Sequence, residues 1–176
     1  MKKNKQKKKG PRYARQRTSY SCGPTALINL GKWLGYRFSI KEHHDQFVGL
    51  SQTTPIMGTS ITNFDKSVRR LFGRSAVIKK RRLPSYASII GHLRCKNCAV
   101  VLLYWRPDND YGRNARDAII GHYTLVVPDE SGKGVVCIND SITQTSVIRT
   151  KEEIKARLRF IRKNRFEDAF VWFIQG

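Results

Sequence analysis

Apolar residues recur at helical spacing in the first half of the chain. Between positions 24 and 34 they stand one, three or four residues apart, at Ala26, Leu27, Leu30, Trp33 and Leu34. This pattern predicts an amphipathic helix that opens at Cys22 and ends at Gly35. The same spacing predicts three more helices, at about 43–48, 60–72 and 84–94.

The second half of the chain has the apolar pattern of a sheet. Residues 99–105 are almost all apolar, as expected of a strand that is covered on both faces. Residues 122–128 and 135–139 predict two strands joined by a turn. Shorter patterns predict strands at 77–78, 145–149 and 169–174 and a basic amphipathic helix at 151–163. Helices followed by an antiparallel sheet indicate the α+β class.

The charge of the chain is strongly positive. It carries 34 basic and 13 acidic side chains, for a formal charge of +21 over 176 residues. We expect residues 1–12, which have almost no apolar side chains, to be a disordered basic arm, and residues 13–176 to form one folded domain. A charge of this size attracts polyanions, so we expect non-specific binding of nucleic acid or another polyanion through the arm.

Targeting signals and cysteine usage favour an intracellular location. The basic arm lacks the apolar core of about 7–15 residues that a secretory signal needs, and no run of about 18 apolar residues predicts a membrane span. Four cysteines are too few for a dense disulfide framework, which favours a reducing compartment. The cytoplasm is the expected location, with a nuclear or virion-associated location as alternatives.

Chemistry is concentrated in residues 16–24, which read Gln-Arg-Thr-Ser-Tyr-Ser-Cys-Gly-Pro. A cysteine that opens a helix lies beside backbone N–H groups and the positive end of the helix dipole, which favour its thiolate. Gly23 allows a substrate backbone to approach, and Pro24 is tolerated in a first helical turn. Gln16 offers an amide N–H that would form a two-donor oxyanion hole with the backbone N–H of Cys22.

A base and an orienting group follow far downstream. His122 stands behind Gly121 at the head of one predicted strand, and Asp140 follows the end of the next strand. The ends of adjacent antiparallel strands can lie within hydrogen-bond reach, so Asp140 is expected to orient His122. Asn139 is the alternative orienting group, since an amide can serve a cysteine–histidine pair.

The ordered set Gln16, Cys22, His122 and Asp140 resembles the papain-like cysteine peptidases of the bacteriocin-processing (double-glycine leader) family and their free-standing relatives. The resemblance runs from about residue 16 to residue 140. It implies a papain-like fold, with N-terminal helices packed on a C-terminal antiparallel sheet. It also implies that Cys22 is the nucleophile, His122 the general base and acid, Asp140 the orienting residue and Gln16 the oxyanion donor. Many relatives follow the aspartate with proline, whereas Ser141 stands here.

The implied reaction is hydrolysis of a peptide or isopeptide bond in a peptide or protein substrate, with small residues at the cleavage point and without a cofactor. Deconjugation of a modifier protein and acyl transfer would use the same residues. The alternative from another functional class is a non-catalytic basic module that binds nucleic acid or an acidic partner on a peptidase-like scaffold.

The remaining cysteines and histidines could alternatively be interpreted as ligands of a metal site. His92, Cys95 and Cys98 have a suggestive spacing, but a structural zinc site needs four ligands and no second Cys-x-x-Cys exists. We therefore expect Cys95 and Cys98 to be small apolar residues at a corner between a helix and a strand, and we expect no metal. His43 and His44 are expected at the surface.

Overall fold

The computed structural model describes most of the chain. The described residues are 12–82, 84–95, 97–105, 121–129, 134–139, 146–150, 152–156, 158 and 170–176. The predicted basic arm, except for Arg12, lies outside them, and so does Asp140. No helix in the described ranges is both long enough and apolar enough to cross a bilayer.

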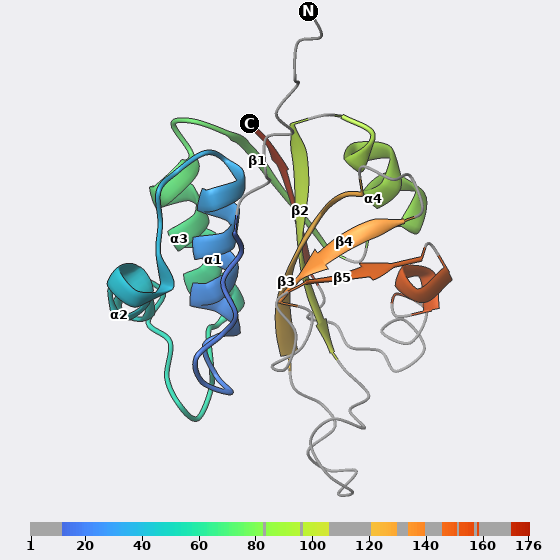
Figure 1. The fold of residues 1–176 in the computed structure, drawn as a ribbon. Helices are drawn as coiled ribbons and strands as arrows, with labels where there is room; N and C mark the ends of the chain where they lie inside the picture. Colours follow the sequence, from blue (N-terminus) through green and yellow to red (C-terminus); the bar gives the residue numbers. More distant parts are fainter. Residues whose placement is uncertain are drawn as a thin grey trace, which may run out of the picture.

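Serine side chains begin three of the helices that Figure 1 labels. The labelled helices are α1 (Cys22–Trp33), α2 (Ile40–Leu50), α3 (Ile61–Phe72) and α4 (Tyr86–Leu93). Ser39, Ser60 and Ser85 each accept a hydrogen bond from the backbone N–H three residues further on. Such a cap satisfies one of the donors that a helix leaves unpaired at its start. α1 begins after Ser21, whose hydroxyl bonds the Thr18 carbonyl instead.

Among the described residues, six strands form one sheet in which every pair is antiparallel. They are β1 (Val77–Arg82), β2 (Cys98–Trp105), β3 (Gly121–Pro128), β4 (Val135–Ile138), β5 (Ser146–Arg149) and β6 (Phe170–Gln175). Their order across the sheet is β1-β6-β2-β3-β4-β5. The near-continuous apolar run of β2 is thus an interior strand, as its pattern predicts.

β1 is longer than the sequence predicts. The apolar pair Val77 and Ile78 predicts a very short strand, but the strand continues through four basic residues to Arg82. All six residues pair with β6, from Val77 opposite Gln175 to Arg82 opposite Phe170. β1 lies at the edge of the sheet, where basic side chains reach solvent. Pairing with a strand from the other end of the chain therefore extends β1 beyond its apolar part.

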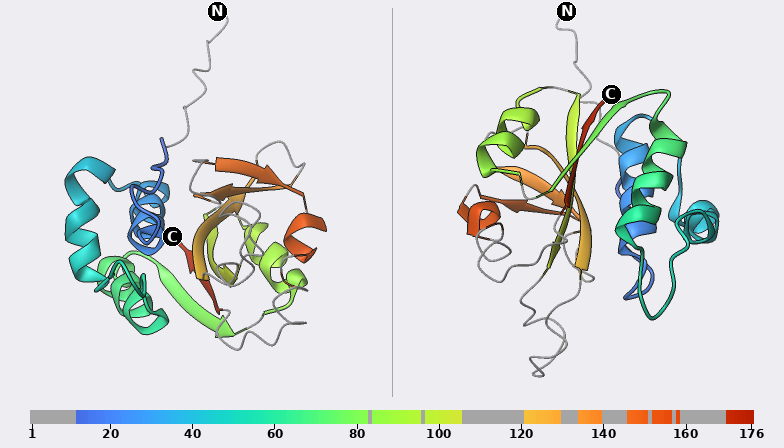
Figure 2. Two further views of the ribbon diagram at one scale, coloured as in Figure 1. Left: turned by 90° about the horizontal axis from the view of Figure 1, so that it is seen from below. Right: turned by 180° about the vertical axis from the view of Figure 1, so that it is seen from behind.

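Helices cover both faces of the sheet (Figures 1 and 2). α1, α2 and α3 lie together on one side, and α4 lies on the other. One core cluster joins α1 and α3 to the sheet and includes Leu27, Phe64 and Trp172. The second cluster joins α4 and Ile154 to the opposite face. Residues 152–156 and 158 are helical, and the rest of the helix predicted at 151–163 lies outside the described residues. The α+β class is confirmed.

The two segments in which the sequence predicts chemistry lie at one end of the sheet. Figure 1 shows the chain entering α1, the chain entering α3 and the beginning of β3 near that end. α1 packs on β3. Cys22 and Ala26 of α1 share a core cluster with Tyr123, Leu125 and Val127 of β3. The strand thus presents alternate side chains to the helix that begins at Cys22.

Candidate active site

Cys22 lines a cleft with a volume of about 510 Å³. Cys22 is the first residue of α1 and is 5% exposed. The cleft wall is completed by residues before Cys22, by the segment that leads into α3, and by β2 and β3: Ser19, Tyr20, residues 55–61, Leu103, Gly121 and Tyr123. Gly121 and Tyr123, the two sequence neighbours of His122, also line this cleft, whereas His122 itself is not among the lining residues. The segment that carries His122 therefore borders the cleft, although its ring does not form the wall.

The start of α1 favours a negatively charged sulfur. The first helical hydrogen bond runs from the Thr25 N–H to the Ser21 carbonyl at 3.0 Å, so Cys22 lies in the first turn. No acidic residue stands in that turn to oppose an anion. The positive end of the helix dipole therefore stabilises the Cys22 thiolate.

Thr59 connects α1 with β3. A Cβ atom on Gly23 would lie 2.3 Å from the Thr59 hydroxyl oxygen, so only glycine fits beside Cys22. The Tyr123 hydroxyl donates to the Thr59 carbonyl at 3.1 Å, and the hydroxyls of Thr53 and Thr59 bond each other at 2.5 Å. Burial, and then the neighbouring Cys22, raise the pKa of Tyr123, which keeps its hydroxyl protonated as a donor.

A short turn, whose place beside Cys22 the sequence pattern does not predict, forms one wall of the cleft. Thr54 and Gly58 pair as an isolated antiparallel bridge, and Gly58 takes a φ of 62°. Between them Ile56 and Met57 are 91% and 82% exposed. The signals for this turn were Pro55 and Gly58, which predict a turn but not its position beside Cys22.

The His122 ring is held by the backbone at the end of β4. His122 is 7% exposed, and its Nε2 lies 2.5 Å from the carbonyl oxygen of Asn139. A carbonyl only accepts hydrogen bonds, so Nε2 carries the proton and Nδ1 has the lone pair of the neutral ring. This bond sets both the tautomer and the direction of the ring. Asn139 has a φ of 58°, which turns the chain out of the strand.

Gln16 and Asn139 form a second contact in the same place, although 123 residues separate them. The Gln16 backbone N–H donates to the Asn139 side chain at 3.2 Å, and the Asn139 amide donates to Gln16 Oε1 at 3.1 Å. The Gln16 amide nitrogen donates to the Thr18 carbonyl at 3.0 Å. The structure therefore brings Gln16, Asn139 and His122 together. The sequence offers the Asn139 side chain as an alternative orienting group for His122. In the structure this side chain bonds Gln16, and it is the Asn139 backbone carbonyl that bonds the His122 ring.

The other cysteines and histidines form no comparable site. Cys98 is 2% exposed at the start of β2, and burial, followed by its hydrogen bond and charge interaction with Cys95, raises its pKa to about 12. No group of three or more His, Cys, Asp or Glu side chains in the described ranges could hold a metal ion. The prediction of a surface position for His44 is wrong. His44 lies one turn before Phe47 on the buried side of α2 and bonds Asp45 at 2.7 Å.

Comparison with known proteins identifies the fold. No family model matches the chain, and no curated protein matches it by sequence. The structure is similar to the peptidase domain of Streptococcus ComA, a bi-functional ABC transporter involved in a quorum-sensing pathway. The TM-score is 0.60 at 14% identity, over 94% of this chain and 99% of that one.

A second similar structure is a double glycine motif protease from an AMS/PCAT transporter, in complex with the leader peptide. Its TM-score is 0.57 at 12% identity, over 94% of this chain and 92% of that one. Both neighbours are peptidase domains of transporters. The resemblance inferred from the sequence is therefore confirmed at the level of the fold.

Proposed function

We propose that the protein is a cysteine peptidase that hydrolyses peptide or isopeptide bonds with Cys22 as its nucleophile. The observation that carries the proposal is the position of Cys22, the first residue of α1, in a cleft that both neighbours of His122 also line. A thiol at a helix start is favoured as the thiolate, and the cleft has the size of a small-ligand or peptide site. The peptidase fold of the structural neighbours supports the same reaction class.

In the first half of the proposed reaction, the Cys22 thiolate attacks the carbonyl carbon of the scissile bond and forms a tetrahedral intermediate. The negative oxygen is stabilised by the backbone N–H of Cys22 and by the Gln16 amide. For this role Gln16 Nε2 exchanges its bond to the Thr18 carbonyl for a bond to the oxyanion. Protonated His122 gives its Nδ1 proton to the leaving nitrogen, the C–N bond breaks, and a thioester remains on Cys22.

In the second half, water replaces the amine. His122 Nδ1 accepts a proton from water, the water oxygen attacks the thioester carbonyl, and the Cys22 thiolate leaves. The bond from Nε2 to the Asn139 carbonyl holds the ring through both halves. Asp140, the next residue in the chain, is expected to orient His122; since the Asn139 carbonyl bonds Nε2, we propose that Asp140 also stabilises the imidazolium charge. Because Asp140 does not itself react, its loss is expected to be milder than the loss of His122.

A peptide or protein is the proposed substrate. The double glycine motif protease among the structural neighbours is in complex with a leader peptide, which supports this substrate class for the shared fold. Deconjugation of a modifier protein would use the same nucleophile and base, and it differs in the nitrogen that leaves.

The experiment is cleavage profiling of the purified full chain against a peptide library, with new termini read by mass spectrometry. The wild type and Cys98→Ala are expected to cut the same peptides, and Cys22→Ala is expected to cut none. Cleavage that persists in Cys22→Ala would overturn the assignment. A library that stays intact with the wild type would favour the alternative, a non-catalytic module on a peptidase-like scaffold.

A further inference from the structure

Basic side chains recur along α3 and β1, and four of them are consecutive, at residues 79–82. Residues 61–82 contain eight basic side chains and one acidic side chain. All eight basic residues are exposed, and they form what we name the α3–β1 basic face: Lys66, Arg69, Arg70, Arg74 and residues 79–82. This surface belongs to the folded body and is separate from the basic arm at residues 1–12.

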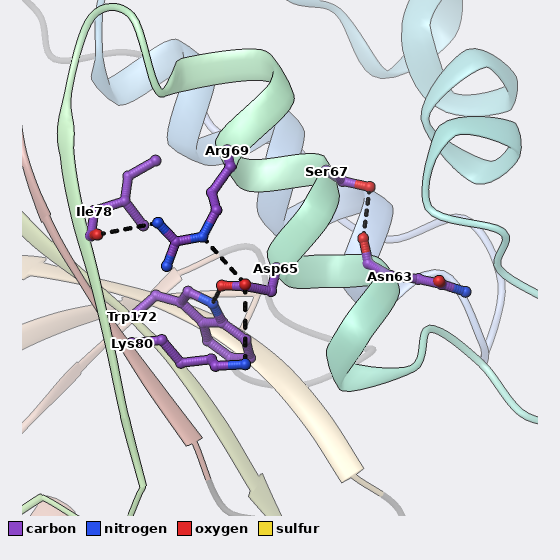
Figure 3. Close-up of polar contacts among 7 residues, drawn as sticks. All are labelled: Asn63, Asp65, Ser67, Arg69, Ile78, Lys80 and Trp172. Atoms are coloured by element: carbon purple, nitrogen blue, oxygen red, sulfur yellow. Dashed lines mark hydrogen bonds and ion pairs between the residues drawn. The ribbon is translucent and has the colours of Figure 1, made fainter.

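The single carboxylate of this segment ties the helix to the strand (Figure 3). Asp65 accepts a hydrogen bond from Trp172 Nε1 at 2.8 Å and one from Arg69 Nε at 3.1 Å, and Lys80 Nζ lies 3.9 Å away. Burial works to raise the pKa of Asp65, but the bonds from Trp172 and Arg69 outweigh it and hold the pKa below its usual value. Asp65 therefore stays ionised and holds α3 against Trp172 of β6 and beside Lys80 of β1.

The strand presents its cations on both sides of the sheet edge. β1 pairs with β6 and ends the sheet on that side. Lys80 lies over the Phe170 ring at 5.2 Å, and Arg81 lies over the Phe173 ring at 5.8 Å. Trp172, the strand partner of Lys80, belongs to the core cluster under α3, whereas Phe173 belongs to the opposite cluster. Neighbouring cations thus flank the edge about 3.3 Å apart along the strand.

The surface has the composition of a nucleic-acid interface. The apolar side of α3, with Phe64, Val68 and Phe72, is buried in the core, so it cannot insert into a lipid surface. Val77, 55% exposed, is the large apolar side chain that this segment exposes. Protein–protein interfaces have an apolar centre and few lysines, whereas protein–DNA interfaces are far more positively charged. Five of the eight cations are arginines, whose planar forks match phosphate oxygens.

We propose that the α3–β1 basic face binds the phosphate backbone of a nucleic acid strand. Binding is electrostatic and independent of base sequence, because phosphate contacts position a strand without reading it. Each phosphate that the face neutralises releases a counterion, so affinity falls steeply as salt rises. The proposal does not depend on peptidase activity, and its failure would leave the role of Cys22 untouched.

The test compares two variants of the full chain that lose the same charge. The face variant carries Arg70→Gln, Arg74→Gln, Lys79→Gln and Arg81→Gln, which leaves Asp65 and its partners intact. The control variant carries the same change at four exposed cations elsewhere: Arg17→Gln, Arg37→Gln, Lys41→Gln and Arg94→Gln. Both variants keep the whole basic arm, residues 1–12, so a difference between them reports the face. Thermal unfolding confirms that both are folded.

Binding of a fluorescein-labelled 20-mer of deoxythymidine is measured by anisotropy at several salt concentrations. The slope of log K against log salt is expected to fall by about 3 in the face variant, since each neutralised contact to a single strand contributes roughly 0.7. In the control variant it is expected to change by less than about 1. Equal losses in both variants, or none in either, would overturn the proposal.

One competitor and one vesicle-binding measurement separate nucleic acid from other polyanions. Poly-glutamate at equal charge is expected to displace the oligonucleotide less well than unlabelled oligonucleotide does. Binding to vesicles of phosphatidylserine and phosphatidylcholine is expected to be the same for both variants. Displacement by poly-glutamate as effective as by oligonucleotide would point to an acidic polypeptide instead. Loss of vesicle binding confined to the face variant, with oligonucleotide binding kept, would point to a membrane. Either result contradicts the proposal.

Discussion

Cys22 and Cys98 are both buried cysteines at the first residue of a regular element, yet their surroundings differ. Cys22, 5% exposed, opens a helix without acidic residues in its first turn and borders a cleft. Cys98, 2% exposed, opens a strand in a corner where burial and Cys95 raise its pKa to about 12. At Cys22 the helix start favours the thiolate and acts against the cost of burial, whereas at Cys98 burial and Cys95 both disfavour it.

If Cys22 is the nucleophile, as we propose, exposure alone does not separate a reactive cysteine from a structural one. What differs is the charge around the sulfur and whether a substrate can reach it. Cys98 has the Cys-x-x-Cys spacing that suggests chemistry, but its raised pKa makes it a small apolar residue at pH 7. Cys22 has a helix dipole, a cleft and a histidine strand beside it. The following predictions test this contrast, from the largest effect to the smallest.

Removing each thiol gives the sharpest contrast. Cys22→Ala is expected to lower kcat/KM by roughly 10⁴-fold or more on the best peptide of the library, because it removes the proposed nucleophile. Cys98→Ala is the matched control and is expected to keep activity within about threefold, with a small loss of stability from lost packing. Steady-state kinetics on both folded variants checks this. If Cys98→Ala lost as much activity as Cys22→Ala, the two sites would not differ as we describe.

His122→Ala is expected to lower kcat by roughly 10²–10⁴-fold, the contribution of a general base and acid. His92→Ala is its control. His92 lies in α4, the helix that leads to Cys95 and Cys98. Its Nε2 bonds the Ile174 carbonyl at 2.9 Å, so the His92 ring, like that of His122, is held by a backbone oxygen. Its loss is expected to change thermal stability and not kcat. A His122→Ala variant with wild-type kcat would show that the base lies elsewhere.

Gln16→Ala is expected to lower kcat by roughly 10²–10³-fold while KM changes little, as when one oxyanion donor is lost. Gln16 also bonds Asn139, which holds the His122 ring. Gln16→Glu separates these roles, because Glu keeps an acceptor for Asn139 but loses the donor. Both variants should lose kcat to a similar degree. Recovery of activity in Gln16→Glu would assign Gln16 to positioning Asn139 and not to the oxyanion.

Gly23, beside Cys22, and Gly91, in the helix that leads to Cys98, differ in the space that surrounds them. Gly23→Ala places a Cβ 2.3 Å from the Thr59 hydroxyl oxygen and is expected to cost about 1–3 kcal/mol of stability, since Thr59 and Tyr123 must shift. Gly91→Ala, in the helix that leads to Cys98, meets no atom within 4 Å and is expected to stabilise the protein by about 0.5–1 kcal/mol. Thermal unfolding measures both. A Gly23→Ala variant as stable as wild type would contradict the close contact with Thr59.

The local sequence pattern predicts most of the helices and strands. The features that it does not predict, such as the full length of β1, depend on pairing between distant segments of the chain. The period of Leu27 and Leu30 and the apolar run of β2 are local properties, so α1 and β2 form where the sequence predicts. β1 extends through Lys79 to Arg82 because β6 supplies a ladder from the other end of the chain. Nothing near β1 in the sequence encodes that partner.

The candidate site shows the same division. Cys22 and His122 were identifiable because each stands at the head of its own element, which is a local signal. The contact between Gln16 and Asn139 joins residues 123 positions apart, and the fit of Thr59 against Gly23 depends on the packing of two helices. Residues 55–58 have the composition of a turn, but only the fold places this turn beside Cys22. Spacing in the sequence carries no record of such contacts.

The most direct test of the contrast is the alkylation rate of each cysteine in the native full chain. Iodoacetamide is applied at several pH values between 6 and 9, and peptides containing the four cysteines are quantified by mass spectrometry. Denatured protein is labelled in parallel to give each intrinsic rate. Cys22 is expected to react at least roughly 10-fold faster than Cys98 at pH 7, while Cys98 labelling still rises at pH 9 because its pKa is about 12. A Cys22 that reacts no faster than Cys98 would contradict its assignment as the nucleophile.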